Sequence, residues 1–180
     1  MDKEVFREMA KETLKGFPEE KKRIEEEKLH KQLIQSNEWK NAAVIGMTIS
    51  VGWEVETRPL FEWAWKEGKR TAAPVVEKGN PLLRFYEITS FDDCRKAAFG
   101  LIEPDPDTQP PVSLDDLELL VVPGLAYSPD GYRIGYGGGY FDRVLKQTSA
   151  HSVSLALSCQ QVKAVPREVH DEKVAEVLCP

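Results

Sequence analysis

Two hydrophobic patterns divide the chain, one before residue 40 and one after it. Residues 2–37 place a few apolar side chains among many charged ones at helical spacing, which predicts two helices separated at residues 16–18 (Gly-Phe-Pro). Pro18 suits the first turn of the second helix, where a backbone N–H has no partner in any case. The apolar stripe of this helix consists of Ile24, Leu29, Leu33 and Ile34. Such a stripe predicts a helix that covers a sheet, and contact with a partner helix is the alternative use of the same face.

After residue 40, short apolar runs alternate with polar, turn-forming segments. The runs predict buried strands, because about four to eight apolar residues between turn signals are typical of a parallel sheet. We place these strands at residues 42–48, 71–76, 82–88, 117–122 and 153–157. Helices are expected between them at 57–67 and 139–146. Strands that alternate with helices indicate an α/β layered fold, in which helices flank a mostly parallel sheet.

Composition narrows the class of protein. The 180 residues, 41% of them hydrophobic, fit a single domain over residues 1–180. The net charge of -6 argues against a nucleic-acid partner, and no apolar run approaches the ~18 residues that a membrane span needs. The three cysteines are odd in number and form no CxxC pair, as expected of a reduced cytoplasmic protein. We expect a monomer, although the sequence leaves the oligomeric state open.

Residues 103–111 are rich in proline and acidic side chains. Proline stiffens an extended backbone and acidic groups favour solvent, so a stiff surface connection is expected here in preference to a functional segment. The sequence shows no internal repeat and no domain boundary.

A cluster of glycines is a candidate phosphate site. Four glycines stand within residues 135–139, preceded by Arg133 and followed by Asp142. Glycines expose backbone N–H groups to a ligand, and such groups at the start of a helix bind anions. The cluster follows the strand predicted at 117–122, at the edge where parallel sheets bind ligands. Asp142 would lie where a Mg²⁺ ion bound to phosphate needs a carboxylate oxygen. Taken alone, the cluster is equally compatible with a tight structural turn.

Several standard motifs are excluded. The dinucleotide fingerprint fails because Tyr140 stands where its third glycine belongs, and the P-loop fails because no Gly-Lys-Ser/Thr sequence follows. The R-x-x-G-x-G loop of acyl-CoA acetyltransferases fails because Tyr136 replaces its first glycine. His30, His151 and His170 are scattered without metal-ligand spacing, and no nucleophile motif such as G-x-S-x-G is present.

The flanks of the glycine cluster carry a family resemblance. Residues 120–127 read LVVPGLAY, and residues 130–145 read DGYRIGYGGGYFDRVL. Together they resemble the signature of the 5-formyltetrahydrofolate cyclo-ligase family (5,10-methenyltetrahydrofolate synthetase), in which VPGLAF precedes G-x-R-L-G-x-G-x-G-Y-Y-D-R. Here Ile134 stands for the leucine of that signature. Phe141 stands for its second tyrosine and lacks the hydroxyl.

Four more segments resemble the family in the same order along the chain. They are residues 3–7 (KEVFR), 54–57 (EVET), 99–104 (FGLIEP) and 170–174 (HDEKV). The resemblance therefore extends over most of the chain.

This resemblance implies an enzyme that converts 5-formyltetrahydrofolate to 5,10-methenyltetrahydrofolate, with ATP as co-substrate and Mg²⁺ as cofactor. A formamide carbonyl is a poor electrophile and its oxygen a poor leaving group, and phosphorylation of that oxygen removes both obstacles. The folate N10 would then attack the activated carbon, and phosphate would leave. Positioning and charge neutralisation dominate phosphoryl transfer, so cations and free backbone N–H groups are the groups to expect in the site.

The resemblance also implies roles for individual residues. The predicted ATP site comprises Lys3, Arg7, Arg133, Gly135, Tyr136, Gly137, Gly138, Gly139, Tyr140 and Phe141. The expected catalytic residues are Lys3, Arg133 and Tyr140. The predicted folate site comprises Val51, Glu54, Glu56, Gly135, Tyr136, Gly137, Gly138 and Gly139. The predicted metal ligands are Asp142 and Asp171.

Most of these assignments have a structural alternative. Lys3 and Arg7 could form an ordinary solvated helix face, because exposure is the default for charged side chains. Asp142 could stabilise a helix N-terminus through the helix dipole. Asp171 is equally compatible with a turn residue.

The folate contacts contain two open choices. Glu56 is the first choice to pair with the amide-amidine edge of the pterin and Glu54 the second, and either could instead be a surface charge or a helix cap. Trp53, Trp63 and Trp65 could line a folate pocket. Trp63 and Trp65 stand two positions apart in a predicted helix, so they cannot both face it.

A non-catalytic folate- or nucleotide-binding protein of the same fold is the alternative to an enzyme. The joint presence of Lys3, Arg7, Arg133 and Asp142 favours the enzyme.

Overall fold

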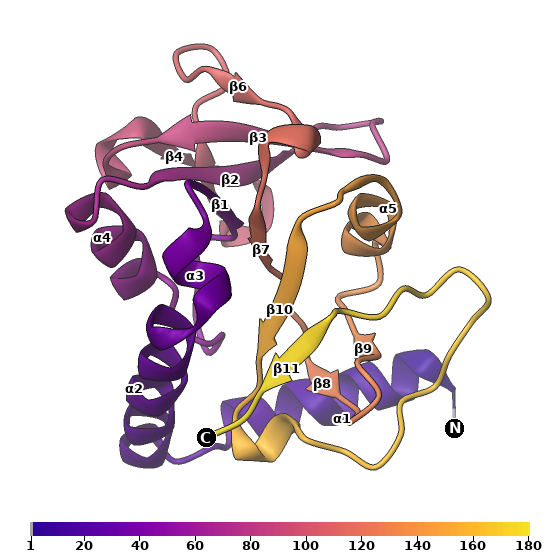
Figure 1. Ribbon diagram of the computed structural model, residues 1–180. Coiled ribbons are helices and arrows are strands. Elements are labelled where there is room, and N and C mark those ends of the chain that lie inside the picture. The colour runs from indigo at the N-terminus through magenta and orange to yellow at the C-terminus, as the bar shows by residue number, and fades with distance from the viewer. Residues whose placement is uncertain (1) are drawn as a thin grey trace.

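The computed structural model describes residues 2–180, in which helices lie on both sides of a twisted sheet (Figure 1). The helices are α1 (Lys3–Lys15), α2 (Glu19–Gln35), α3 (Asn37–Asn41), α4 (Arg58–Lys66) and α5 (Tyr140–Gln147). The strands of the main sheet are β1 (Val44–Met47), β2 (Arg70–Val76), β3 (Leu83–Ile88), β6 (Pro111–Val112), β7 (Leu119–Val121), β10 (His151–Leu155) and β11 (Glu176–Leu178). Two small hairpins pair β4 (Cys94–Lys96) with β5 (Ile102–Pro104) and β8 (Ala126–Tyr127) with β9 (Arg133–Ile134).

The main sheet has the strand order β11-β10-β7-β1-β2-β3-β6. The five strands from β11 to β2 run parallel, whereas β3 and β6 pair antiparallel at one edge. The edge is antiparallel because only residues 77–82 separate β2 from β3, too few for the crossover that a parallel pair needs. The prediction of a mostly parallel sheet flanked by helices is confirmed.

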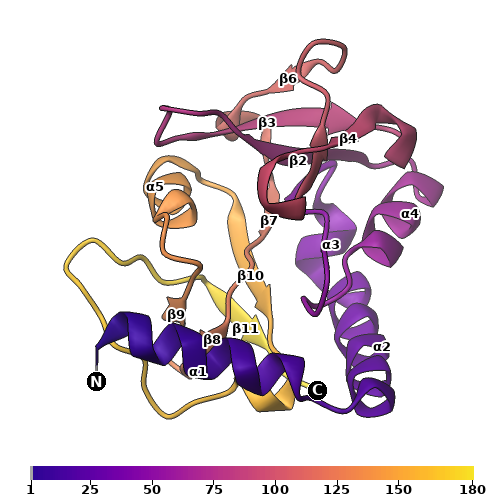
Figure 2. The same ribbon diagram turned by 180° about the vertical axis from the view of Figure 1, so that it is seen from behind.

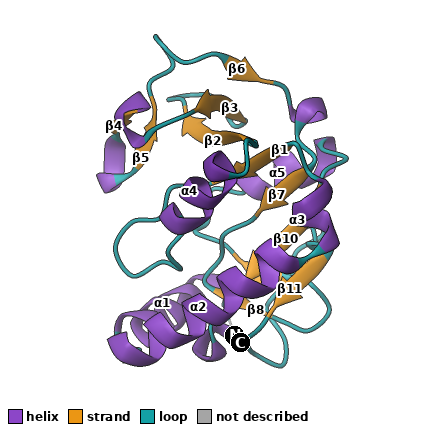
Figure 3. Cartoon of the chain, turned by 60° about the vertical axis from the view of Figure 1, so that its left-hand side comes forward, coloured by secondary structure: helices purple, strands orange, loops and turns teal. Residues whose placement is uncertain are grey.

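Alternation along the central strands divides the core between the two faces of the sheet. Ile45 of β1 belongs to the apolar cluster that contains Leu33 of α2 and Phe61 of α4. Its neighbour Val44 belongs to a second cluster, with Val144 of α5. Figures 2 and 3 show the same division, with α2, α3 and α4 gathered on one side of the strands and α5 on the other.

The helix break predicted at residues 16–18 is confirmed. Gly16 caps the C-terminus of α1, and α2 begins directly after Pro18. In both Figure 1 and Figure 2, α1 lies beside β8 and β9, below the carboxyl ends of β7 and β10. This places the N-terminal helix at the edge of the sheet where the glycine cluster also lies.

The buried face of α2 differs from the predicted stripe. Leu29 and Leu33 are buried as expected, but Ile24 is 43% exposed. In its place Glu25 and Glu26 are buried, because backbone N–H groups of two neighbouring loops donate to their carboxylates. A hydropathy pattern cannot anticipate a carboxylate that is buried in order to accept hydrogen bonds.

The two hairpins, β6 and β11 do not appear in the sequence prediction, because strands of two or three residues are too short to show a period. One of them corrects the surface connection expected at residues 103–111. Glu103 lies in β5, is 7% exposed and accepts a hydrogen bond from the Val76 N–H at 3.2 Å. Burial raises the pKa of this carboxyl group. No helix among residues 2–180 is long and apolar enough to cross a membrane.

Candidate active site

A cavity of about 750 Å³ opens between α1, the glycine loop (residues 135–139) and the segment that follows β1. All the predicted site residues except Glu56 line it. These are Lys3, Arg7, Val51, Glu54, Arg133, Gly135, Tyr136, Gly137, Gly138, Gly139, Tyr140, Phe141, Asp142 and Asp171. The fold therefore gathers in one place the residues assigned to both substrates and to the metal.

The N-terminal cations point into this cavity. The Lys3 and Arg7 side chains are only 17% and 15% exposed, which does not support an ordinary solvated helix face. Lys3 Nζ donates to Asp171 Oδ2 at 2.7 Å and to Glu168 Oε2 at 2.9 Å. Arg7 Nε donates to the Gly135 carbonyl at 3.1 Å, so its guanidinium lies over the glycine loop. Helix α1 thus presents two cations one turn apart to the same ligand space.

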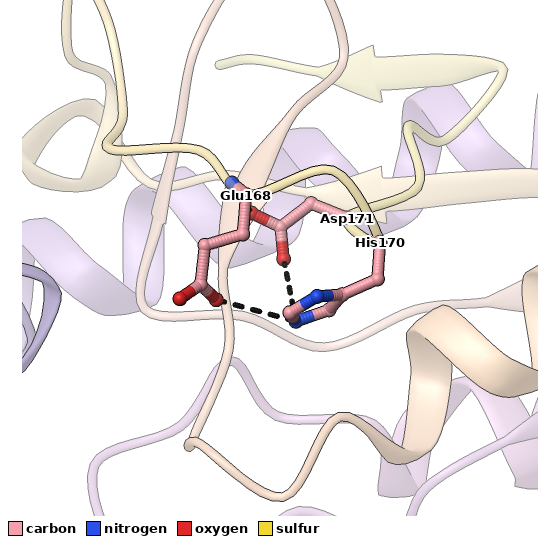
Figure 4. A group of neighbouring side chains, drawn as sticks. All are labelled: Glu168, His170 and Asp171. Atoms are coloured by element: carbon pink, nitrogen blue, oxygen red, sulfur yellow. Dashed lines mark hydrogen bonds and ion pairs between the residues drawn. The ribbon is translucent and has the colours of Figure 1, made fainter.

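Asp171 lies in a small polar cluster with Glu168 and His170, shown in Figure 4. His170 Nε2 lies 3.2 Å from Glu168 Oε2 and 3.9 Å from Asp171 Oδ1. One ligand atom from each of the three residues falls within a 4.8 Å span. Sequence reasoning set His170 aside because it compared histidines only with one another. The spacing Glu-x-His-Asp was the signal that would have placed it beside the predicted metal ligand.

The charges of this cluster are compensated by Lys3. Burial lowers the pKa of the Lys3 ammonium, but its hydrogen bonds to Asp171 and Glu168 outweigh that effect and hold the pKa above its ordinary value. Burial raises the pKa of Asp171, but the hydrogen bonds from the Lys3 ammonium and the Glu168 N–H lower it by more, so its pKa lies below the ordinary value. Lys3, Glu168 and Asp171 therefore stay ionised at neutral pH.

The glycine loop leads directly into α5 with an unusual backbone. Gly137 and Gly139 have φ angles of 106° and 66°, a region that favours glycine, and Gly139 is the N-cap of α5. Among the residues that the structure describes, the amides of Gly137, Gly138 and Gly139 donate no hydrogen bond. Free amides at a helix N-terminus that face a cavity favour an anion cradle over a purely structural turn.

Arg133 and Asp142 are held together beneath this loop. The Arg133 side chain is 3% exposed, with Nη1 donating to the Glu172 carbonyl at 2.8 Å and Nη2 lying 3.3 Å from Asp142 Oδ1. Asp142 Oδ1 also accepts from the Glu172 N–H at 3.0 Å. The Nε of Arg133 is buried without a partner, although nearly all buried donors find one. Arg133 therefore orients Asp142, and its Nε is left as a donor without an acceptor.

Glu54 lies on the opposite side of the glycine loop. Its carboxylate accepts hydrogen bonds from the Val51 N–H at 2.8 Å and from the Tyr136 hydroxyl at 2.7 Å. Burial and the Glu54 carboxylate raise the pKa of Tyr136, so its hydroxyl stays protonated and donates. The Trp53 and Tyr136 rings stack with centroids 6.3 Å apart and planes inclined by 24°. These contacts join the segment after β1 to the glycine loop.

The preference for Glu56 over Glu54 is not supported by the geometry. The Glu56 carboxylate is absent from the cavity wall and accepts from Ser50 Oγ at 2.7 Å and from the Arg58 N–H at 3.1 Å. It therefore supports the start of α4, which is the helix-cap alternative. Because Glu54 lines the cavity and Glu56 does not, the two glutamates do not share a face as they would in an extended strand.

The three candidate tryptophans have different surroundings. Trp53 lines the cavity, Trp63 is 42% exposed, and Trp65 packs against Phe91 with ring centroids 5.0 Å apart. Residues 99–104 resemble the family, but the resemblance gave Phe99 no role, and Phe99 lines the cavity with 98% of its surface exposed. It is also the one residue other than glycine with a positive φ, 60°, among residues 2–180. Strain of this kind at an exposed aromatic side chain is characteristic of a binding site.

Comparison with known sequences fits this arrangement. The sequence model of the 5-formyltetrahydrofolate cyclo-ligase family matches residues 1–180. The chain belongs to this family. It is 31% identical to the 5-formyltetrahydrofolate cyclo-ligase of Haemophilus influenzae over 150 residues, which cover 81% of this chain and 79% of the relative. It is 27% identical to the cyclo-ligase of Mus musculus over 187 residues, which cover 98% of this chain and 92% of the relative.

Solved structures of the family show the same fold. The NMR structure of 5,10-methenyltetrahydrofolate synthetase from Aquifex aeolicus superposes with a TM-score of 0.86 at 29% identity, covering 99% of this chain and 90% of that one. The synthetase from Mycoplasma pneumoniae superposes with a TM-score of 0.78 at 18% identity, covering 98% of each chain. At this low identity, the second likeness shows the fold alone. The predictions of the family, of an enzyme and of a folate cyclo-ligase function are confirmed by membership.

Proposed function

We propose that the cavity binds ATP and 5-formyltetrahydrofolate side by side and that ATP activates the formyl oxygen. The observation that carries this proposal is the convergence of both sets of predicted residues on one cavity of about 750 Å³. A space of that size lies in the upper part of the range for small-molecule sites, roughly 300–1,000 Å³. It suits two substrates that must react with each other.

The nucleotide phosphates would lie between α1 and the glycine loop. Lys3 and Arg7 face this space from one side, and the free amides of Gly137, Gly138 and Gly139 face it from the other. Cations and backbone donors fixed in advance stabilise the charge that spreads over a transferred phosphoryl group. Lys3 would exchange its present carboxylate partners for phosphate oxygens when the nucleotide binds.

The acidic residues of the site fit a Mg²⁺ ion. Asp142 and Asp171 both line the cavity, and Mg²⁺ combines one or two carboxylates with substrate phosphates. The Arg133 guanidinium lies beside Asp142, with Nη2 3.3 Å from Asp142 Oδ1, and its buried Nε has no acceptor in the protein. When bound, Mg²⁺ neutralises phosphate charge and holds the phosphate oxygens in place. Asp142 and Asp171 would hold it, while Lys3 and Arg133 turn toward the nucleotide.

The folate would bind at the Glu54 end of the cavity. A carboxylate pairs with the amide-amidine edge of a pterin through two hydrogen bonds, and Glu54 faces the cavity whereas Glu56 does not. Phe99 and Trp53 offer flat surfaces on which a ring system can pack. We therefore prefer Glu54 for this contact, and a role for Glu56 in binding folate remains a prediction.

Chemistry would take place where the two ends meet, at the glycine loop. The formyl oxygen attacks the γ-phosphorus, the bond to ADP breaks, and N10 of the folate then attacks the activated carbon with loss of phosphate. The chain contributes position above all: it holds ATP beside the formyl oxygen, and it holds N10 near the activated carbon in the conformation from which this already intramolecular ring closure proceeds. Tyr140, at the first turn of α5, lines this junction, and its expected catalytic role remains a prediction.

A direct assay tests the proposal. The purified chain is mixed with 5-formyltetrahydrofolate, ATP and Mg²⁺, and methenyltetrahydrofolate is followed by its absorbance while ADP is measured in parallel. We expect equal amounts of both products and no product when ATP or Mg²⁺ is omitted. Binding of both ligands without turnover would instead establish the non-catalytic alternative. Glu54→Gln and Glu56→Gln form a matched pair, and the former should raise the KM for folate more, because Glu56→Gln keeps an acceptor for Ser50 Oγ and does not change the cavity wall.

We also expect the protein to be cytoplasmic and to act as a monomer. Cell fractionation tests the location. Sedimentation of the active enzyme at assay concentration tests the oligomeric state, and loss of activity on dilution would contradict the monomer.

A further inference from the structure

Side chains of helix α2 form hydrogen bonds with the loop that carries Glu54. This loop, residues 48–57, joins β1 to α4. Glu26 Oε1 accepts from the Glu56 N–H at 2.9 Å, and His30 Nε2 donates to the Glu56 carbonyl at 2.6 Å. Both backbone polar groups of one loop residue are therefore held by side chains that stand one turn apart on a single helix.

The contact between α2 and this loop is buried, and the core holds α2 in place. Glu26 is 9% exposed and forms an ion pair with Lys22 one turn earlier on the same helix. Leu29 and Leu33 anchor α2 in the core with 0% and 1% exposure. A carboxylate is buried at a cost unless its hydrogen bonds are satisfied, so the position of the loop is coupled to the packing of the helix.

The loop transmits this position to the cavity. The Glu56 carboxylate accepts from Ser50 Oγ at 2.7 Å, and the next residue, Val51, donates its N–H to Glu54 Oε2 at 2.8 Å. Hydrogen bonds linked by short stretches of the chain, through Glu56 and from Ser50 to Val51, therefore lead from Glu26 and His30 to the carboxylate that faces the cavity. Glu56, which does not reach the cavity, is the point where the loop is held.

We propose that Glu26 and His30 are positioning residues for the folate subsite, which they set by fixing the backbone of Glu56. The proposal rests on the folate role of Glu54 proposed above. They act on the KM for folate because they govern where Glu54 lies, whereas the nucleotide end is built from α1 and the glycine loop.

The neighbouring Glu25 supplies a matched control. It lies on the same helix, is 6% exposed, and accepts from the Ser158 N–H at 2.8 Å and from Ser158 Oγ at 2.6 Å. Its loop contributes no hydrogen bond to Glu54. Loss of Glu25 therefore removes an equally buried carboxylate without disturbing the folate end.

Steady-state kinetics with both substrates tests the proposal. Glu26→Ala and His30→Phe should each raise the KM for 5-formyltetrahydrofolate about fivefold or more, with the KM for ATP and kcat changed less than about twofold. Glu26→Gln and His30→Gln keep an acceptor and a donor and should recover most of the loss. Glu25→Ala should leave the KM for folate unchanged. Equal increases in both KM values, or the same increase with Glu25→Ala, would overturn the proposal.

Combination with Glu54→Ala separates this proposal from the one on which it rests. If Glu54→Ala leaves the KM for folate unchanged, the folate role of Glu54 is wrong. If it raises that KM, then adding Glu26→Ala should cause little further increase, because residues that act through one contact are not additive. Fully additive effects would overturn the positioning role alone. Hydrogen exchange provides a readout on the backbone: Glu26→Ala should speed exchange in residues 49–56, and Glu25→Ala in residues 157–161. Unchanged exchange in residues 49–56 of the Glu26→Ala protein would also overturn it.

Discussion

At the scale of single residues, the cations and carboxylates of the site neutralise one another's charges. Lys3 contacts Asp171, and Arg133 contacts Asp142, so each predicted metal ligand already has a cation beside it. On the proposed function, substrate binding would therefore exchange partners: phosphate would take the cations, and the metal would take the carboxylates. Because each carboxylate has a cation as its partner, the protein avoids the free-energy cost of burying an unpaired charge.

Asp142→Asn tests this exchange. The amide oxygen of asparagine can still accept from the Glu172 N–H, so we expect the fold to persist while the Mg²⁺ concentration for half-maximal activity rises about tenfold or more. Titration of activity with Mg²⁺ at saturating ATP provides the measurement. Asp130→Asn is the control, because that carboxylate pairs with Arg167 outside the cavity. An unchanged Mg²⁺ requirement would show that Asp142 is not a ligand.

Phe99→Ala tests the exposed aromatic side chain. Because Phe99 is 98% exposed, its removal creates no core cavity, and we expect the unfolding temperature to stay nearly constant. The KM for folate should rise about tenfold, since an aromatic stacking surface is lost, while the KM for ATP stays near its original value. Thermal unfolding and steady-state kinetics on the same preparation separate these effects. A change in the KM for ATP alone would assign Phe99 to the nucleotide.

The choice between Glu54 and Glu56 shows what a motif can and cannot predict. The resemblance of residues 54–57 (EVET) to the family picks out a segment along the chain, and one of its two glutamates, Glu54, lines the cavity. The side chain that faces the ligand depends on the turn between Val51 and Glu54, which is closed by a hydrogen bond to the Glu54 carboxylate itself. Nothing in the spacing of two glutamates reveals such a local bond.

At the scale of elements, α5 and the loop before it behave as one unit. The loop needs positive φ at Gly137 and Gly139, and it ends where the first amides of α5 are free. Sequence analysis predicted this helix, but the glycines alone were equally compatible with an anion site or a tight turn, and the family resemblance decided for the anion site. Sequence analysis did not predict β8 and β9, the hairpin that leads into the loop, because strands of two residues are too short to show a period in the sequence.

Gly137→Ala should damage this unit. With φ at 106°, alanine is strained there, and its Cβ would stand 3.4 Å from Arg7 Cζ, so we expect a loss of about 1–3 kcal/mol of stability and a raised KM for ATP. Gly135→Ala is the control, because its Cβ would meet nothing within 4 Å and its φ is not in the positive region. Chemical unfolding and kinetics of the two variants are the measurements. Equal effects would contradict a special requirement at Gly137.

The contact between α2 and the Glu54 loop should depend on pH. Burial lowers the pKa of His30 from 6.5, despite opposing effects of Glu56 and Glu26, so the unfolded chain takes up a proton at a higher pH than the folded one. Stability from this group is therefore complete above about pH 6.5 and declines as the pH falls below it. Urea unfolding at pH 7.5 and 5.5 measures the decline, which should be smaller in His30→Gln. An identical decline in that variant would assign the effect to other groups.

At the scale of the whole molecule, the fold was the easier part to predict. Four of the five parallel strands, β1, β2, β7 and β10, follow from apolar runs long enough to recognise, such as residues 71–76 in β2. The convergence of α1 with the segment around Asp171 does not follow from any local pattern. It depends on how α1 lies across the carboxyl edge of the sheet, which only the assembled structure shows.

This convergence predicts strong stabilisation by ligand. Mg²⁺ and ATP would join α1, the glycine loop and the segment around Asp171, which otherwise meet through few contacts. At about 100 times the dissociation constant, linkage gives about 2.7 kcal/mol and hence a rise in unfolding temperature of several degrees. Thermal unfolding with ATP and Mg²⁺ measures it. Chelation of Mg²⁺ should remove most of the shift, and ATP alone giving the full shift would contradict a metal at Asp142 and Asp171.

The ion pair between Lys3 and Asp171 also has a consequence for biosynthesis. Its two partners are 168 positions apart, so α1 cannot find its acidic partners until the segment around Asp171 has been synthesised. Arg7, Lys11 and Lys15 have glutamates of α1 itself as partners, whereas the carboxylate partners of Lys3 both lie in that late segment. On the proposed function, the nucleotide and metal site would be completed only when this segment folds onto α1, and a chain truncated before Asp171 would lack activity.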